Sequence, residues 1–285
     1  MKKTAFLLIL LISVSFLAAA GTWDNFSLNS GEGPITVNPN IELGFIGVLY
    51  HTIQFGQDGT SFDYVKDGGQ NNLFFYQRLT MDVKIKERHS LVFLYQPLDV
   101  SSEVITTKDV KIEDKVFVSG TPMSLRYGFD FYRFSYLYDV LKRKDQELSF
   151  GVSMQIRNAT IDFASQDGEI FVSNRNIGPV PVLKMRYIQP INDLFWFGTE
   201  IDGFYASNKF INGSLEDSFT GSIIDASIRG GYRISSLADA YLNIRYIAGG
   251  AEGTETDENE DGDGDDGYTK NVLHTIALSL GIKVR

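Results

Sequence analysis

The chain has 285 residues, a formal net charge of -10 and no cysteine. The absence of cysteine excludes disulfides, thiolate metal ligands and a cysteine nucleophile, and the negative charge argues against a nucleic-acid partner. Beyond the N-terminal region the chain has the length of one domain, and it contains no segment long and apolar enough for a transmembrane helix.

The N-terminus has the pattern of a secretion signal. Lysines at positions 2 and 3 precede an apolar stretch over residues 4–17, and alanines at positions 18–20 offer a cleavage site. An uncleaved anchor helix is the alternative, but the apolar stretch is short for a bilayer span. We therefore expect residues 1–20 to be a signal peptide removed after Ala20, followed by a periplasmic lead-in over residues 21–40.

From residue 41 onward, apolar and polar residues alternate in a series of stretches. The first covers residues 41–54, and the clearest covers residues 73–86, where odd positions are mostly apolar and even positions mostly polar or charged. A period of two over this length predicts an extended strand with one apolar and one polar face. A polar turn at residues 87–90 and an apolar stretch at residues 91–95 complete a hairpin.

The alternation recurs to the end of the chain. Further strands are predicted at residues 123–138, 147–163, 179–188, 195–205, 219–234, 242–246 and 271–285. In the first of these, the apolar residues expected to face outward are at first odd-numbered, as Leu125 and Tyr127 are. Further along they are even-numbered, as Phe134 and Tyr136 are. Such a slip of phase predicts a β-bulge near Arg133.

Short turns and long loops alternate along the chain, as they do on the opposite rims of outer-membrane barrels. We expect the long loops to be extracellular; they lie around Asp58, Lys108, Asp167, Asn212 and Asp261. The predicted fold is all-β. It is a transmembrane antiparallel up-and-down β-barrel of about ten strands over residues 41–285, with eight or twelve strands as alternatives.

The signal, the alternating strands and the loop asymmetry together resemble bacterial outer-membrane β-barrel proteins in general, from roughly residue 41 to the end. One departure is the ending Gly281-Ile282-Lys283-Val284-Arg285, because many such proteins end in an aromatic residue that the assembly machinery reads. The resemblance implies the outer membrane of a diderm bacterium, with outer-membrane lipid, lipopolysaccharide and the barrel-assembly machinery as partners. A soluble periplasmic β-sandwich is the alternative, but soluble strands are usually shorter.

Charged residues of both signs occupy the expected inward face of many strands. They are Arg78, Asp82, Lys84, Arg126, Asp130, Arg157, Lys184, Arg186, Glu200, Asp202, Asp225, Arg229 and Arg245. In a barrel of this size the interior has little room beyond its own side chains. We therefore interpret the set as a salt-bridge plug, with a selectivity ring in a narrow pore as the alternative.

The acidic loop before the last strand contains a partial calcium-binding pattern. Oxygen ligands at alternate positions and a following glycine match the opening of a calcium loop, but Tyr268 stands where a bidentate acid is usual. The candidate ligands are Asp257, Asn259, Asp261, Asp263 and Asp265. We expect weak binding of Ca2+ or another divalent cation at most, and no other cofactor. A solvated loop is the alternative.

The residues available for catalysis are few. The histidines are His51, His89 and His274, and the first and last of these lie on the two strands that must pair to close the barrel. Some outer-membrane enzymes, such as lipid A deacylases and omptin-type proteases, place a histidine with a serine or an acid near the extracellular end. No serine motif of those enzymes is recognisable in this sequence.

These observations favour a structural or cell-surface interaction role for a barrel whose lumen is largely plugged by charges. A narrow porin or small-solute transporter is the alternative. A barrel enzyme acting on lipid A or peptides is a further, less favoured one. The sequence does not indicate a solute, a surface ligand or an oligomeric state.

Overall fold

The computed structural model of the chain describes residues 35–143, 145–207, 219–254 and 267–285. The expected signal peptide and residues 21–34 of the expected lead-in lie outside the described residues, so both stay predictions. The rest of the lead-in belongs to the first strand. This strand starts at Ile35 instead of residue 41, because Ile35 already pairs with Ile85 of the next barrel strand.

Ten long strands form the wall of the barrel. They are β1 (Ile35–Phe55), β3 (Leu73–Ile85), β4 (His89–Ile105), β7 (Pro122–Asp139), β8 (Glu147–Ser165), β9 (Phe171–Pro190), β10 (Phe195–Ser207), β11 (Phe219–Arg233), β12 (Ala238–Thr254) and β13 (Tyr268–Val284). Each pairs antiparallel with the next, and β1 closes the barrel by pairing with β13. The predicted ten-stranded antiparallel barrel is confirmed. In the described part of the chain, no helix is long and apolar enough to cross a membrane.

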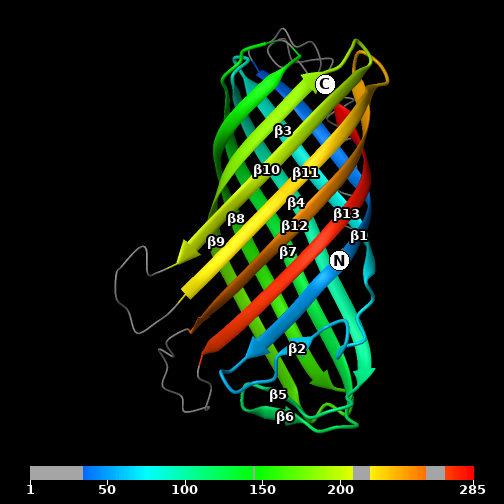
Figure 1. Cartoon of the computed structure of the whole chain (residues 1–285), viewed down its shortest axis with the longest axis vertical. Coiled ribbons are helices and arrows are strands. Elements are labelled where there is room, and N and C mark those ends of the chain that lie inside the picture. The colour runs from blue at the N-terminus through cyan, green and yellow to red at the C-terminus, as the bar shows by residue number, and fades with distance from the viewer. Residues whose placement is uncertain (1–34, 144, 208–218, 255–266) are drawn as a thin grey trace, which may run out of the picture.

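The connections are sorted between the two ends of the barrel (Figure 1). The short turns and the C-terminus lie at one end, here called the turn end. The longer connections that the structure describes lie at the other, here called the loop end, together with β2 (Phe62–Asp63) and a hairpin of β5 (Val110–Ile112) and β6 (Lys115–Phe117). This sorting follows from an up-and-down topology, in which successive connections fall on alternate rims.

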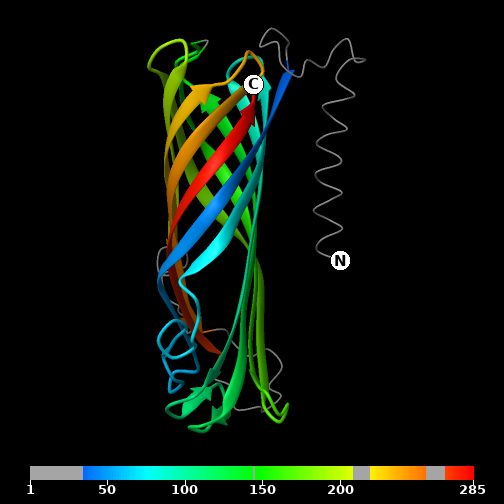
Figure 2. The ribbon, with the colours of Figure 1, turned by 90° about the vertical axis from the view of Figure 1, so that its right-hand side faces the viewer.

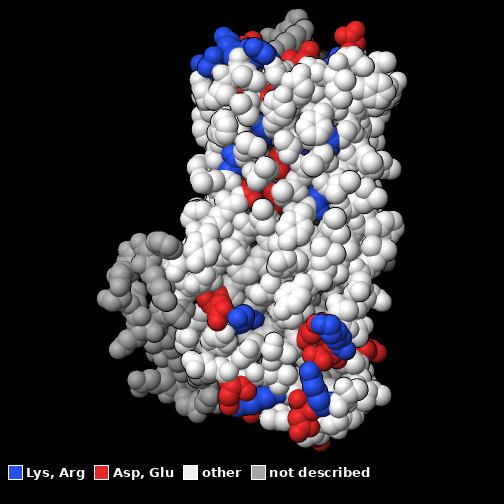
Figure 3. Space-filling model, in the orientation of Figure 1, with Lys and Arg blue, Asp and Glu red and all other residues white. Residues whose placement is uncertain are grey.

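Apolar side chains cover the outer wall of the barrel. On β13, Leu278, Leu280 and Ile282 are exposed by 53, 69 and 57%, whereas Ser279 and Gly281 between them face inward and are buried. Figure 3 shows a largely uncharged surface on one face, with charged side chains gathered near the two ends and a few more seen between outer side chains in the upper half. An apolar surface of this extent suits the hydrocarbon core of a bilayer. The chain is a transmembrane β-barrel.

The outer faces of β4 and β7 show where the apolar band ends. Tyr95 stacks on Tyr132 with their ring centroids 5.0 Å apart. Further toward the loop end, Arg126 forms ion pairs on the outer wall with Asp99 at 3.1 Å and Asp162 at 3.6 Å. Aromatic residues followed by charged ones mark the boundary of the hydrocarbon region. The strands β4, β7 and β8 therefore extend beyond the bilayer at the loop end.

Two expectations for β7 are wrong. Leu125 and Tyr127 do not face lipid; both are 2% exposed and pack inside the wall, in the part of β7 that lies beyond the bilayer. The bulge expected near Arg133 is also absent, because the pairing of β7 with β4 and β8 continues without a shift. A bulge lies instead at Leu49 of β1, where the register with β13 shifts by one residue.

The wall of the barrel is not continuous over its whole height. The pairing of β3 with β4 ends at Leu79 and Tyr95, and the pairing of β9 with β10 ends at Leu183 and Gly203. Beyond these points β4, β7, β8 and β9 continue as a paired four-stranded sheet, which Figure 2 shows reaching past the other strands. Two seams, β3–β4 and β9–β10, thus separate this sheet from the other six strands.

A hydrophobic cluster, here called the outer core, fills the space beside the four-stranded sheet at the loop end. Its strands are the end of β1, β2, the β5–β6 hairpin and the inward faces of β7, β8 and β9. Its buried members are Ile53, Phe55, Phe62, Tyr64, Val110, Ile112, Phe117, Met123, Leu125, Tyr127, Ile161, Phe163 and Val172. An ion pair between Lys108 and Asp67 at 3.0 Å joins two of the long connections beside it. The loop end therefore has a packed core of its own.

Replacing Leu278 by Arg should destabilise the barrel in phosphatidylcholine vesicles by about 2–4 kcal/mol, because it places a guanidinium in hydrocarbon. Replacing Ser101 by Arg is the matched control, because Ser101 is exposed on β4 beyond the boundary at Tyr95. Its cost should lie within about 0.5 kcal/mol of zero. Denaturant titrations followed by tryptophan fluorescence measure both. Equal losses would contradict the position of the bilayer.

Candidate functional site

Charged side chains fill the barrel interior from its middle toward the turn end. They come from β1, β3 and β7 to β12, and each stands on the inward phase of its strand, so alternation brings them together. This charged layer consists of Glu42, Arg78, Asp82, Arg133, Glu147, Lys184, Arg186, Glu200, Asp202, Asp225, Arg229 and Arg245. All but Arg229 are buried, and the side chain of Arg229 is 14% exposed.

Asp225 is the central acceptor of the charged layer. Its carboxylate accepts hydrogen bonds from Arg78 Nη2 at 3.2 Å, Arg133 Nη1 at 3.1 Å and Arg245 Nη1 at 2.5 Å. The three arginines stand on β3, β7 and β12, so one carboxylate joins widely separated parts of the wall. A carboxylate without water is stable only when charge-assisted hydrogen bonds replace its hydration.

Asp202 lies opposite Asp225 in the pairing of β10 with β11. Two adjacent carboxylates repel each other unless cations lie close to both. Arg133 meets this need, because its Nη1 is 2.9 Å from Asp202 and 3.1 Å from Asp225. Lys184 adds a second cation, with its Nζ 2.9 Å from Asp202. The two aspartates are therefore held by shared cations.

Arg186 organises the part of the layer nearer the turn end. Its Nη1 donates to Asp82 at 2.6 Å, its Nε donates to Glu147 at 2.6 Å, and its Nη2 donates to Ser90 Oγ at 3.1 Å. Lys84 also contacts Glu147, at 2.9 Å. The planar guanidinium offers donors in fixed directions. One side chain thus connects β3, β4, β8 and β9.

Glu42 and Glu200 share two arginines near the closing strands. Arg229 lies 2.5 Å from Glu200 and 3.7 Å from Glu42, and Arg245 lies 3.5 Å from Glu42. The amide of Asn243 donates to Glu42 at 2.8 Å. Because Glu42 stands on β1 and the other residues stand on β10, β11 and β12, these contacts stabilise the closure of the barrel.

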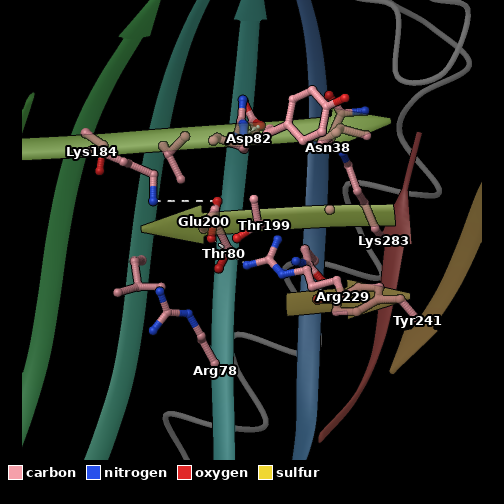
Figure 4. A pocket seen from close by; sticks show the side chains of 18 of the residues that line it. Asn38, Arg78, Thr80, Asp82, Lys184, Thr199, Glu200, Arg229, Tyr241 and Lys283 are labelled. Atoms are coloured by element: carbon pink, nitrogen blue, oxygen red, sulfur yellow. Dashed lines mark hydrogen bonds and ion pairs between the residues drawn. The ribbon is translucent and has the colours of Figure 1, made fainter. Parts of the chain in front are cut away.

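Little space remains among these side chains. Figure 4 shows Arg78, Thr80, Lys184 and Arg229 around a pocket in the layer. The cavity there has a volume of about 40 Å³. One water needs about 10–15 Å³ of such volume, so the cavity holds roughly three waters. The charged layer therefore acts as a plug built from the barrel's own side chains.

Most of the charged residues expected in the lumen lie in this layer, and Lys84 lies beside it. Arg126 and Asp130 do not: they stand on the outward phase of β7, and Arg126 is paired on the outer wall with its side chain 43% exposed. The side chain of Arg157 lies outside the described residues. The same is true of the candidate cation ligands Asp257, Asn259, Asp261, Asp263 and Asp265, so weak cation binding stays a prediction.

Three members of the layer were not expected. Glu42 stands between Ile41 and Leu43, two outward apolar residues, so simple alternation was enough to place it inside. Arg133 was assigned to a bulge that does not exist, and this assignment hid its inward position. Glu147 is the first residue of β8 and precedes the outward residues Leu148 and Phe150 of an alternating stretch, so alternation was enough to place it inside as well.

The histidines of β1 and β13 do not form a joint site. His51 faces inward, where its ring stacks on Tyr64 with centroids 4.1 Å apart and its Nδ1 lies 2.8 Å from Gln70 Oε1. His274 stands on the outward phase, where its Nδ1 lies 2.8 Å from Tyr246 Oη. The two rings therefore lie on opposite sides of the wall although their strands are neighbours.

No protein-family model matches the chain, and no curated protein sequence is similar to it. Similar solved structures include the outer membrane protease OmpT from Escherichia coli, with a TM-score of 0.46 and 11% identity over 90% of this chain and 99% of that chain. The transport unit of the autotransporter AIDA-I from Escherichia coli gives 0.42 and 13% over 95% and 96%. The outer membrane protein OprG from Pseudomonas aeruginosa gives 0.28 and 11% over 86% and 95%.

These similar structures are bacterial outer-membrane β-barrel proteins. Their sequences share no more than 13% identity with this chain, and their TM-scores lie below 0.5. The likeness therefore assigns no activity to the chain. The fold itself follows from the strand pairing described above.

Replacing Asp225 by Asn should destabilise the barrel by about 3–5 kcal/mol, because it leaves Arg78, Arg133 and Arg245 without their shared carboxylate. Replacing Arg126 by Ala removes an exposed ion pair on the outer wall and should cost about 0–1 kcal/mol. Denaturant titrations in the same vesicles measure both. A small loss for the Asp225 variant would show that water reaches the charged layer.

Proposed function

We propose that this chain is an outer-membrane β-barrel of a diderm bacterium with a structural or cell-surface interaction role, and that its interior does not conduct solutes. The observation that carries the proposal is the charged layer. Its side chains are paired across the lumen and leave a cavity of only about 40 Å³. Opposite charges pair with one another, as between Lys184 and Asp202, and this pairing argues against an aqueous path between them.

A narrow porin is the alternative, and it needs charged side chains that face water along a continuous path. In the charged layer the opposite holds, because Asp202, Asp225 and Arg245 are fully buried. Each is within 3 Å of an oppositely charged atom. Moving an ion through this region means separating such pairs in a confined space. The geometry therefore favours the closed barrel.

The loop end supports a surface role. The outer core packs the long connections against the four-stranded sheet, and ion pairs such as Lys111 with Asp58 and Lys108 with Asp67 tie them together. A surface made of packed connections presents a defined shape to a partner at lower entropic cost than free loops. This construction is what supports the interaction role.

The enzyme alternative has no specific support. The side-chain hydrogen bond and ring contacts described for His51 are with Gln70, Tyr64 and Tyr127, none of which is a serine or an acid. Binding of lipopolysaccharide, handling by the barrel-assembly machinery and weak Ca2+ binding by the acidic loop stay predictions.

Purified protein in planar bilayers should show no steady single-channel conductance, because the charged layer fills the lumen. Replacing Lys184 and Asp202 together by Ala removes a buried pair with no net change of charge, and should open a measurable conductance. The matched control replaces Lys111 and Asp58, an ion pair at the loop end, by Ala and should show no conductance. A steady, ion-selective conductance of the unmodified protein would overturn the proposal.

The proposed orientation places the loop end outside the cell. Because the chain contains no cysteine, single cysteines report their positions without background. Cysteines at Lys108 or Asp167, exposed in long loops, should react with a membrane-impermeant maleimide on intact cells. Cysteines at Glu87 or Asn192, exposed in short turns, should react only after lysis. The reverse pattern would place the loop end in the periplasm.

A further inference from the structure

A second cavity lies in the barrel interior between the charged layer and the outer core. Its volume is about 220 Å³. Most of its wall is apolar and includes Phe129, Phe131, Phe204, Ile247 and Leu273. A cavity of roughly 150 Å³ with such walls stays dry and binds benzene. The larger cavity therefore has room for a small hydrocarbon group.

The side of this cavity nearest the charged layer is polar but carries no uncompensated charge. Gln96 and Gln155 line it there. The oxygen of Gln96 accepts a hydrogen bond from Arg78 at 2.7 Å, and that of Gln155 accepts one from Arg133 at 2.9 Å. Both arginines also bind Asp225. A charged ligand would have to compete with these pairs, so the cavity suits an uncharged one.

The cavity extends to the β9–β10 seam. Pro179 and Pro181 on β9 line it from one edge, and Phe204 and Ala206 on β10 line it from the other. A proline has no N–H to donate, so it cannot continue a ladder on the side its nitrogen faces. The pairing of β9 with β8 continues through both prolines. The nitrogens of both prolines therefore face β10. Because they carry no N–H, the ladder between β9 and β10 cannot continue there, and the seam stays open.

The outer side of this seam faces lipid. Leu183 and Tyr205 flank it on the outer wall, with exposures of 62 and 58%. Pro179 and Pro181 are themselves exposed on the outer wall, although they also line the interior cavity. No β-ladder closes the wall here, because the pairing of β9 with β10 stops at Leu183 and Gly203. The seam therefore offers a route between the lipid and the cavity.

The β3–β4 seam has the same origin but is bridged. Its pairing ends at Tyr95, two residues before Pro97. Gln96 accepts hydrogen bonds across it from Arg78 at 2.7 Å and from Tyr76 at 3.4 Å. These contacts hold the two edges together. Of the two seams, β9–β10 is the one whose two edges both line the cavity, whereas at β3–β4 the lining residues come from β4.

We propose that this cavity binds an uncharged apolar molecule, about the size of one aromatic ring or a short alkyl chain, which enters from the lipid through the β9–β10 seam. The binding activity is additional to the structural or surface role. It does not depend on whether the barrel conducts, because the apolar walls of the cavity and the β9–β10 seam are formed by residues outside the charged layer.

The test uses the full barrel in phosphatidylcholine vesicles and an uncharged medium-chain alcohol that carries a diazirine. After irradiation, cross-links are mapped by mass spectrometry. Cross-links at Phe204 and Leu273 should be saturable and should disappear with excess unlabelled alcohol, whereas those at lipid-facing Leu278 should neither saturate nor disappear. Absence of saturable cross-links inside the barrel would overturn the binding site.

Two filling variants test the site. Replacing Ala251, which stands on the inward phase of β12, by Trp places a large ring in the cavity and should abolish the interior cross-links. Replacing Ala226 by Trp on the outward phase of β11 is the matched control and should leave them intact. Replacing Ala206 by Trp fills the cavity from the seam side and serves if the first variant does not fold. Interior cross-links that survive in a folded filling variant overturn the proposal.

The route is tested by restoring the missing donors. Replacing Pro179 and Pro181 together by Val allows β9 and β10 to continue their pairing, and this should slow cross-linking inside the barrel. Replacing Pro97 by Val at the other seam is the control and should leave the rate unchanged. An unchanged rate in the β9–β10 variant would overturn entry from lipid.

Discussion

Pairing of buried charges across the lumen is the interaction on which the rest of the structure depends. A barrel of ten strands must fill its interior with its own side chains, and here the filling around Asp225 and Arg186 is ionic. Buried ion pairs are seldom more stabilising than a hydrophobic core of equal volume. Their effect here is geometric. Each arginine contacts residues on several strands, so the charges are satisfied only when every strand has its correct neighbours and register.

The interior changes character along the barrel axis, and the wall changes with it. Toward the turn end all ten strands are paired around the charged layer. Toward the loop end the wall separates into two sheets around an apolar space. An unpaired backbone group in lipid costs several kcal/mol, so an open edge at membrane depth needs a remedy. Prolines at positions 97, 179 and 181 provide one, because a proline has no donor to leave unpaired.

The alternation of residues was enough to predict the strands and the closed barrel, because lipid and lumen impose opposite chemistry on successive residues. It was not enough for β7. Leu125 and Tyr127 are apolar, so they were assigned to lipid, but beyond the bilayer the solvent is water and apolar side chains turn inward. Arg126 faces outward there for the same reason. Alternation separates two faces and does not say which of them is inside.

The seams and the cavity were beyond prediction for a different reason. They depend on where two neighbouring strands stop pairing, which is a property of two distant segments considered together. The prolines that end the pairing are visible in the sequence, but Pro97, Pro179 and Pro181 could equally stand in turns. Their role becomes clear only once β8 is seen to pair through the latter two without interruption.

The bulge at Leu49 makes β1 a strand of two phases. Before it, even-numbered residues such as Glu42 face the charged layer, and after it odd-numbered residues such as His51 and Ile53 face the outer core. One inserted residue thus lets a single strand direct even-numbered residues into the charged layer and odd-numbered residues into the outer core. It also means that the length of β1 is specified to the residue. Loss of one amino acid at this point would turn either Glu42 of the charged layer or His51, which stacks on Tyr64, toward the outside of the barrel.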